Sequence, residues 1–209
     1  MRLTNAVRYS AGKKLTGIVY IHRISDDKFG GSVAKNFQVF RELCGDRTLK
    51  NVVLVTNMWG RVTPSLGVGR EKQLQSKHFK SAIDKGARLL RYEDTPESAQ
   101  EILRTILHNE PEVLKIQQEL VEEHKEMGQT GAGAELSKEM RKMMESRTKE
   151  IKQLEKKREK AKTKKNQGLH EELDEEIESL REQLEELKEY MVRMQVDFVK
   201  KKRWWKFWQ

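Results

Sequence analysis

The sequence has one cysteine, three prolines and no long hydrophobic run, and each shortage excludes a class of protein. The single thiol, Cys44, forms neither an internal disulfide nor a cysteine-ligated zinc cluster. No stretch approaches the roughly 20 apolar residues that cross a membrane, and the first residues lack the apolar core of a signal peptide. We therefore expect a cytoplasmic protein. Cys44 lies near Phe40 and Leu43, which predicts a core thiol rather than a nucleophile.

Charge is abundant and unevenly spread. Charged residues make up 36% of the 209 residues, well above the roughly 25% of ordinary domains. Residues 1–110 hold 19 Lys and Arg against 11 Asp and Glu, whereas residues 111–209 hold 23 against 22, so the net charge of +9 lies mostly in the first half. These cations are scattered among apolar segments, so we expect no specific nucleic-acid binding. One domain with a charged helical extension fits these figures.

The first half reads as a strand, a helix and a second strand. Apolar, β-branched runs at 15–21 and 51–56 are typical of strands buried on both faces of a parallel sheet. Between them, apolar residues recur at three- and four-residue spacing, which predicts a helix capped by Ser32 and ended by Gly45.

The same alternation continues along the chain. A helix is predicted at about 69–85, a third strand at 87–92, and a helix that begins after Thr95 as N-cap. Asn109 and Glu112 have the spacing of a capping box, which predicts that a further helix starts there. Strands that alternate with helices predict an α/β fold, a parallel three-stranded sheet with flanking helices.

Three glycines within residues 128–133 break the helical pattern and predict a hinge between a domain at 1–127 and a charged helical region at 134–199. Apolar residues in that region recur at alternating steps of three and four, the heptad seam of a coiled coil. The seam consists of Ile177, Leu180, Leu184, Leu187, Met191, Met194 and Phe198. It predicts self-association through Ile177 to Phe198.

The two parts of this helical region carry net charges of opposite sign. Residues 149–165 contain nine Lys and Arg and three Asp and Glu, while residues 171–189 contain two and ten. A hairpin that folds the basic helix onto the acidic one satisfies both charge and apolar pattern. One long helix with solvated faces is the other arrangement, slightly favoured because helices tolerate a single glycine.

The last ten residues, 200–209, combine five cations with four large aromatic residues. Tryptophan prefers the headgroup region of a bilayer, and basic residues are attracted to anionic leaflets. A peripheral contact with an anionic membrane surface and a frayed tail without a partner are equally compatible with this composition. The residues predicted for the membrane contact are Lys201, Arg203, Trp204, Trp205 and Trp208.

The predicted binding site follows the second strand. Open α/β sheets bind ligands beyond the carboxyl ends of their strands, so a polar, irregular loop there is placed to recognise a base. The loop consists of Thr56, Asn57, Met58, Trp59 and Gly60. Trp59 has two alternative roles, stacking on a base or packing, and packing is the commoner role beside a sheet edge.

Other candidate sites do not carry chemistry. Residues 12–14, Gly-Lys-Lys, lack the first glycine and the hydroxyl of a phosphate-binding loop and precede their strand, so they are rejected as one. His22 and His78 have no partners at metal or triad spacing and are interpreted as structural. Asp26 and Asp27 are interpreted as a solvated turn rather than a catalytic carboxylate pair. No catalytic or metal-binding residue is therefore assigned.

Several stretches nevertheless share sequence with a known family. These stretches are residues 12–25, 40–46, 49–59, 119–121 and 131–134. Together they resemble the C-terminal half of the G domain of fungal P-loop GTPase-like proteins related to the septin and immune-associated nucleotide-binding families. The resemblance covers residues 10–136 and implies a partial P-loop NTPase-like sheet followed by a coiled-coil extension.

The resemblance implies a role for the loop after the second strand. In such proteins an Asn/Thr-Lys-x-Asp motif recognises guanine, and its Asp binds the ring nitrogens. Here Asn57 keeps the first place, Met58 replaces Lys and Gly60 stands where Asp belongs. Loss of that carboxylate is expected to weaken guanine selectivity by about 1.5 to 3 kcal/mol.

The resemblance also implies that the phosphate-binding loop and the magnesium-holding switch segments should precede residue 10, with the strand of that loop beside 15–21. The chain is then a truncated or degenerate guanine-nucleotide-binding protein that does not hydrolyse GTP alone. GTP or GDP with Mg²⁺ would bind only if the missing half were supplied. The alternative function is a coiled-coil oligomerisation or adaptor protein with a membrane-binding tail.

Overall fold

The computed structural model describes residues 14–27, 29–163 and 167–196. It divides into two compact units, unit 1 at Met1–Lys125 and unit 2 at Glu126–Gln209. Each unit is built around its own apolar core, so the two are described separately.

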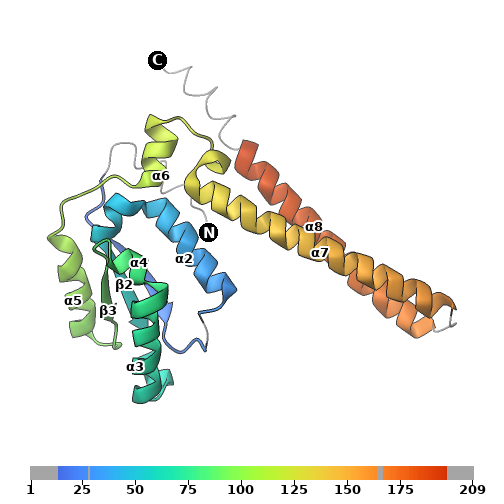
Figure 1. The fold of residues 1–209 in the computed structure, drawn as a ribbon, viewed down its shortest axis with the longest axis horizontal. Coiled ribbons are helices and arrows are strands. Elements are labelled where there is room, and N and C mark those ends of the chain that lie inside the picture. Colours follow the sequence, from blue (N-terminus) through green and yellow to red (C-terminus); the bar gives the residue numbers. More distant parts are fainter. Residues whose placement is uncertain (1–13, 28, 164–166, 197–209) are drawn as a thin grey trace. The chain divides into compact units, whose positions relative to one another are not determined.

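Unit 1 is built on a parallel three-stranded sheet. Its strands are β1 (Ile18–Arg23), β2 (Val52–Asn57) and β3 (Arg88–Arg91), in the spatial order β1-β2-β3. The register aligns Ile18 with Val52 and Val53 with Arg88. The prediction of an α/β fold with a three-stranded parallel sheet is therefore confirmed (Figure 1).

Helices cover one face of this sheet. They are α2 (Gly31–Cys44), α3 (Pro64–Gln73), the π-helical turn η3 (Leu74–His78) and α4 (Lys80–Ile83). Phe79, between η3 and α4, is fully buried at the centre of the core beneath them. Its ring centroid lies 4.7 Å from that of Phe37 and 6.1 Å from that of Tyr20. Aromatic packing therefore joins α2, which carries Phe37, and the η3 to α4 segment, which carries Phe79, to Tyr20 of β1.

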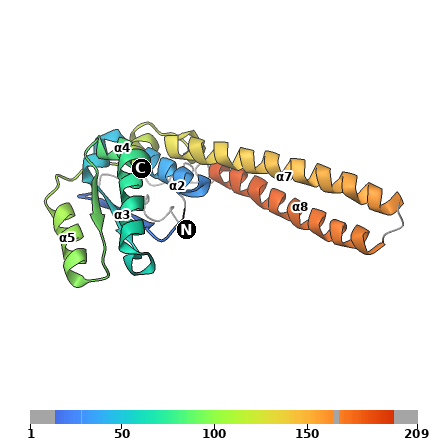
Figure 2. The ribbon, with the colours of Figure 1, turned by 60° about the horizontal axis from the view of Figure 1, so that its bottom comes forward.

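The opposite face carries one helix, α5 (Pro96–Leu107), which packs Ile102 on Val53 and Val55 of β2. This helix leaves the same face of β1 uncovered, because Val19 is 38% exposed and Ile21 is 60% exposed. Strands of parallel sheets are usually covered on both faces, so β1 presents an unusual apolar surface. In Figure 2, α5 lies on one side of the sheet and α2 and α3 on the other.

The predicted caps of two helices have different outcomes. α2 begins at Gly31 with Gly30 as N-cap, so Ser32 is not the N-cap. Gly45 ends α2 as predicted, and its φ of 76° is a conformation that glycine adopts most readily. The Thr95 cap of α5 is confirmed, since its side chain accepts a hydrogen bond from the Ser98 amide.

The helix predicted at 69–85 starts earlier and is interrupted. α3 begins at Pro64, which is preorganised for a first turn, and η3 separates α3 from α4. The π-helical turn inserts one extra residue, and its Phe79 amide donates to the Leu74 carbonyl oxygen at 2.7 Å. The insertion directs Phe79 into the core.

The capping box predicted at Asn109 and Glu112 is wrong. Glu112 instead forms an isolated antiparallel bridge with Leu15, in which the two amide-to-carbonyl distances are 2.8 and 2.9 Å. Its carboxylate lies 2.9 Å from Lys50 Nζ and 3.3 Å from Arg47 Nε. This long-range pairing holds the segment extended. The remaining elements of unit 1 are η1 (Asp46–Asn51), η2 (Trp59–Arg61), α6 (Lys115–Gln117) and η4 (Gln118–Glu122).

Unit 2 is a helical hairpin. A short 3₁₀ turn, η5 (Met127–Gln129), precedes two long helices, α7 (Gly131–Thr163) and α8 (Gln167–Val196), which lie side by side (Figures 1 and 2). The arrangement as one long helix is therefore wrong. Its core is formed by Ile151, Leu154, Ala161, Leu173, Ile177 and Leu180. The predicted seam packs within the hairpin at Ile177, Leu180 and Leu184, and self-association through Ile177 to Phe198 stays a prediction.

Charged pairs also join the two helices. Arg158 lies 2.8 Å from Asp174, and Arg181 lies 3.0 Å from Glu155. The buried apolar core holds the hairpin together, and these partly exposed pairs add the charge match between the basic and the acidic helix. At its base, a Cβ on Gly133 would lie 1.7 Å from the Met127 carbonyl oxygen, so this close approach requires glycine.

Replacing Phe79 with alanine should destabilise unit 1 by about 3 to 5 kcal/mol, because it removes a fully buried ring and leaves a cavity. Hydrogen exchange of the β2 amides measures this loss. Leu103→Ala is the control, since Leu103 is 56% exposed and its truncation should cost about 0.5 kcal/mol or less. Equal losses in both variants would contradict this core assignment.

Candidate functional site

The loop predicted to recognise a base is an ordered turn at the carboxyl end of β2. Asn57 ends the strand, and its carbonyl oxygen accepts a hydrogen bond from the Ile24 amide at 2.9 Å. Met58 has a φ of 61°, in the left-handed region that most side chains avoid, and η2 follows with Gly60 exposed. A strained residue between two fixed segments is a feature that recurs at ligand sites.

Trp59 is held on several sides. Its indole N–H donates to the Thr56 carbonyl oxygen at 3.1 Å. The Arg91 guanidinium lies over the indole at 4.2 Å from the ring centroid, and a Cβ on Gly67 would lie 2.8 Å from the ring edge. Arg91 is fixed in turn by Glu71, which accepts from its Nε at 2.8 Å. The structure therefore favours the packing role of Trp59 over stacking on a base.

Asn57 has an unused hydrogen-bond acceptor. Its side-chain Oδ1 is buried and has no hydrogen-bond partner within the described residues. In the strand register Asn57 lies opposite Arg23 of β1, whose guanidinium pairs with Asp26 at 3.2 Å. Buried side-chain oxygens are rarely left without a donor, so this atom is an exception to the usual pairing.

A second loop leaves the same edge of the sheet, between β3 and α5. The Tyr92 amide donates to the Thr56 carbonyl oxygen at 2.8 Å, which places the two loops side by side. Asp94 also has a left-handed backbone, with φ 62°, and accepts from the Tyr92 hydroxyl at 3.2 Å. This hydrogen bond raises the pKa of Tyr92. Asp94 was not predicted as a site residue, because the identity of one aspartate in a turn does not show whether its φ is positive.

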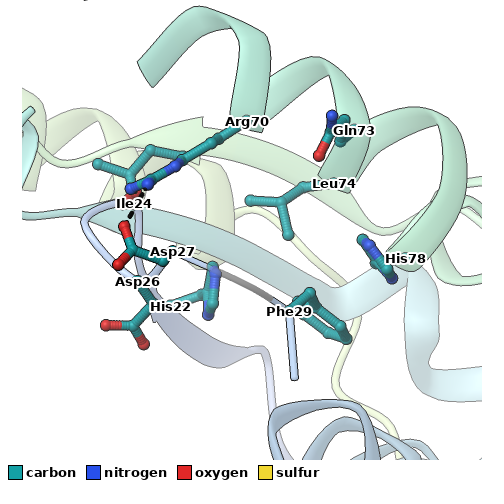
Figure 3. Close-up of a pocket in the computed structure, with 9 residues that line it drawn as sticks. All are labelled: His22, Ile24, Asp26, Asp27, Phe29, Arg70, Gln73, Leu74 and His78. Carbon is teal, nitrogen blue, oxygen red and sulfur yellow. Dashed lines mark hydrogen bonds and ion pairs between the residues drawn. The ribbon is translucent and has the colours of Figure 1, made fainter. Parts of the chain in front are cut away.

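A cavity of about 240 Å³ lies near the carboxyl end of β1 (Figure 3). It is lined by His22, Ile24, Asp26, Asp27, Phe29, Arg70, Gln73, Leu74 and His78. Figure 3 shows Arg70 extending to the loop after β1, where its guanidinium binds the Asp27 carboxylate at 2.6 Å. It also donates to the carbonyl oxygens of Ile24 and Ser25 at 3.0 and 2.9 Å. This contact ties the loop to α3 and was not predicted.

The two histidines in this cavity have structural surroundings. His22 is buried against Phe29 and Phe79, and that burial lowers the pKa of His22 although Asp26 opposes the shift. His78 stacks on Phe29 with 4.2 Å between ring centroids. Within the described ranges, no cluster of three or more His, Cys, Asp or Glu side chains is placed to hold a metal ion.

The remaining predictions concern Cys44 and the tail. Cys44 is buried, and that burial raises the pKa of its thiol to about 12, which confirms a core thiol. Lys201, Arg203, Trp204, Trp205 and Trp208 lie outside the described residues, so their membrane contact stays a prediction. Of the helices in the described part of the chain, none has the length and apolar content needed to cross a bilayer.

Comparison with known proteins adds no relative. No family model, no curated protein and no solved structure matches the sequence. The case for a function therefore rests on the residues and their geometry.

Trp59→Ala should destabilise unit 1 by about 3 kcal/mol, because it removes a packed ring beside Gly67 and Arg91. Trp59→Phe keeps most of that packing and should cost about 1 kcal/mol for the lost hydrogen bond. Hydrogen exchange of the β2 amides distinguishes the two variants. Unchanged stability in Trp59→Ala would restore the alternative in which the ring is free to stack on a base.

Cys44 should react with iodoacetamide only when unit 1 unfolds, because a buried thiol whose pKa is about 12 carries almost no thiolate at neutral pH. Mass spectrometry after timed labelling in buffer and in urea measures this. Rapid modification of the native chain would contradict the core assignment.

Proposed function

We propose that unit 1 is the base-recognition half of a guanine-nucleotide-binding domain of the P-loop GTPase type, degenerate and unable to hydrolyse a nucleotide alone. One observation carries this proposal. At the carboxyl end of β2, where such a domain begins its base-recognition motif, Asn57 has a buried Oδ1 without a hydrogen-bond partner among the described residues. A nucleotide base or a neighbouring amide would supply the absent donor.

The arrangement of loops supports the same reading. The carboxyl ends of parallel strands meet at one edge, and the loops after β2 and β3 leave that edge side by side. Each loop carries a non-glycine residue with a left-handed backbone, Met58 in one and Asp94 in the other. Paired strain at the ligand-binding edge is more consistent with a binding site than with a plain connection.

The uncovered side of β1 is consistent with half a domain. Within the described residues β1 pairs with β2 alone, and Val19 and Ile21 are exposed on the face that α5 leaves open. The resembled proteins have the strand of their phosphate-binding loop at this edge. A strand added here would pair the open edge of β1 and complete the sheet.

The loop after β2 also supports the proposal that the base-recognition motif is degenerate. Gly60 stands at the place of the guanine-binding carboxylate, and a Cβ there would meet no atom within 4 Å. An aspartate side chain would therefore fit at this position without displacing a neighbour. Nucleotide binding should be weak, with little preference for guanine over adenine.

Restoring the carboxylate tests this proposal. Calorimetric titration of the full chain should give weak, similar affinities for GDP and ADP, because the chain offers contacts to the base and the Mg²⁺ and phosphate contacts belong to the missing half. Gly60→Asp should bind GDP about 10- to 100-fold more tightly and leave ADP unchanged, because one charged hydrogen-bond pair to the guanine ring is regained.

Gly69→Asp is the matched control. Gly69 is also exposed with open space around its Cβ, but it lies on α3 rather than in the loop. Its substitution adds the same charge and should leave both affinities unchanged. An absence of heat from the unmodified chain at high micromolar GDP, or equal effects of the two substitutions, would refute the proposed function.

A further inference from the structure

The outer surface of α8 carries a continuous acidic stripe. Its members recur at alternating steps of four and three residues, and every one is exposed. They are Glu171, Glu175, Glu178, Glu182, Glu185 and Glu189. Helical positions at this spacing share one face, so the stripe is a straight ridge of negative charge along the helix.

α7 carries a basic stripe with the same alternation of four and three. Five of its seven positions are lysines and two are glutamates, and all seven are exposed. They are Lys138, Lys142, Glu145, Lys149, Lys152, Lys156 and Glu159. The two stripes therefore have the same repeat and opposite sign.

Each stripe lies on the outside of the hairpin. Glu175 and Glu178 each precede a buried seam residue, Ile177 and Leu180, by two positions. Two residues correspond to about 200° around a helix, so the stripe faces away from α7. On α7, Lys149 and Lys152 have the same relation to Ile151 and Leu154. Two helix diameters, about 20 Å, separate the stripes, which exceeds the screening length of about 8 to 10 Å in ordinary buffer.

Most of these charges are not neutralised within the chain. Over the described ranges, Lys142, Lys149, Lys152 and Lys156 form no salt bridge, and neither does Glu182. Of the hairpin's own pairs, Arg158 with Asp174 lies beside the seam, and Arg181, which pairs with Glu155 of α7, reaches the acidic stripe only at Glu178. Other glutamates of the stripe have only exposed partners three or four residues away on α8.

We propose that hairpins from separate copies of this chain associate head to tail, with the basic stripe of one against the acidic stripe of the next. Ile177, Leu180 and Leu184 of the apolar seam are already packed inside each hairpin, which leaves the outer surface for a second copy. The stripes share a repeat and can register along their length. The two stripes face opposite directions, so each copy contacts one neighbour through its basic stripe and another through its acidic stripe. Such a contact between two different surfaces is heterologous. An anionic membrane would engage the basic stripe alone.

Sedimentation velocity of the full chain tests this assembly. At about 50 mM NaCl the mean mass should rise above 24.6 kDa as the protein concentration increases. At about 500 mM NaCl it should return to the monomer value, because exposed charge pairs are screened. A monomer at every salt and protein concentration would overturn the proposal.

Charge-reversal variants test the contribution of each stripe to association. Glu175→Lys with Glu182→Lys, or Lys149→Glu with Lys152→Glu, should each weaken association about tenfold or more. An equimolar mixture of the two variants should associate again, because each supplies the stripe that the other needs. Failure of the mixture to associate would contradict the head-to-tail arrangement.

Glu172→Lys with Glu176→Lys is the matched control, because it makes the same charge change on exposed positions of α8 outside the stripe. It should leave the association constant within about twofold of the unmodified chain. Circular dichroism verifies that every variant keeps its helices. An equal effect of this control would overturn the proposal. The proposal would also be overturned if the chain stayed monomeric but bound vesicles rich in phosphatidylserine, and if Lys149→Glu with Lys152→Glu abolished that binding.

Discussion

Parallel pairing of β2 with both of its neighbours is the constraint on which unit 1 depends. β2 is almost wholly buried, and its register fixes β1 on one side and β3 on the other. Parallel strands need crossovers, so α2 and the α3 to α4 segment must return over the sheet, and the three carboxyl ends must meet at one edge. The candidate site is a consequence of this geometry, since the loops after β2 and β3 have no other place to lie.

The same geometry leaves an imbalance between the two sides of the sheet. The core around Phe79 closes one face, whereas α5 alone serves the other and leaves Ile21 exposed. Among the residues that the structure describes, β1 has one unpaired edge and an exposed apolar face, and such a strand favours a partner that adds a strand. This asymmetry, and the Asn57 Oδ1 that has no partner among the described residues, support the proposal of one half of a nucleotide-binding fold.

Local signals predicted the strands and the Thr95 cap, because β-branched runs and N-cap chemistry act within a few residues. Long-range contacts decided the rest. Glu112 is held extended by Leu15, a partner almost 100 residues away. The site loop could be located from the sequence, but the packing of Trp59 depends on Arg91, whose position only the folded sheet defines. The choice of a hairpin over one helix likewise depends on pairing between helices.

We propose that the carboxyl edge of β2 binds a nucleotide base. A nitrogen-15 NMR titration of the full chain with GDP tests this proposal, because the Asn57 side-chain amide gives its own signals. These signals and the backbone amides of residues 56–60 should shift as GDP is added to high micromolar concentration. Unchanged signals at that edge, or shifts confined to the cavity around His22, would contradict it.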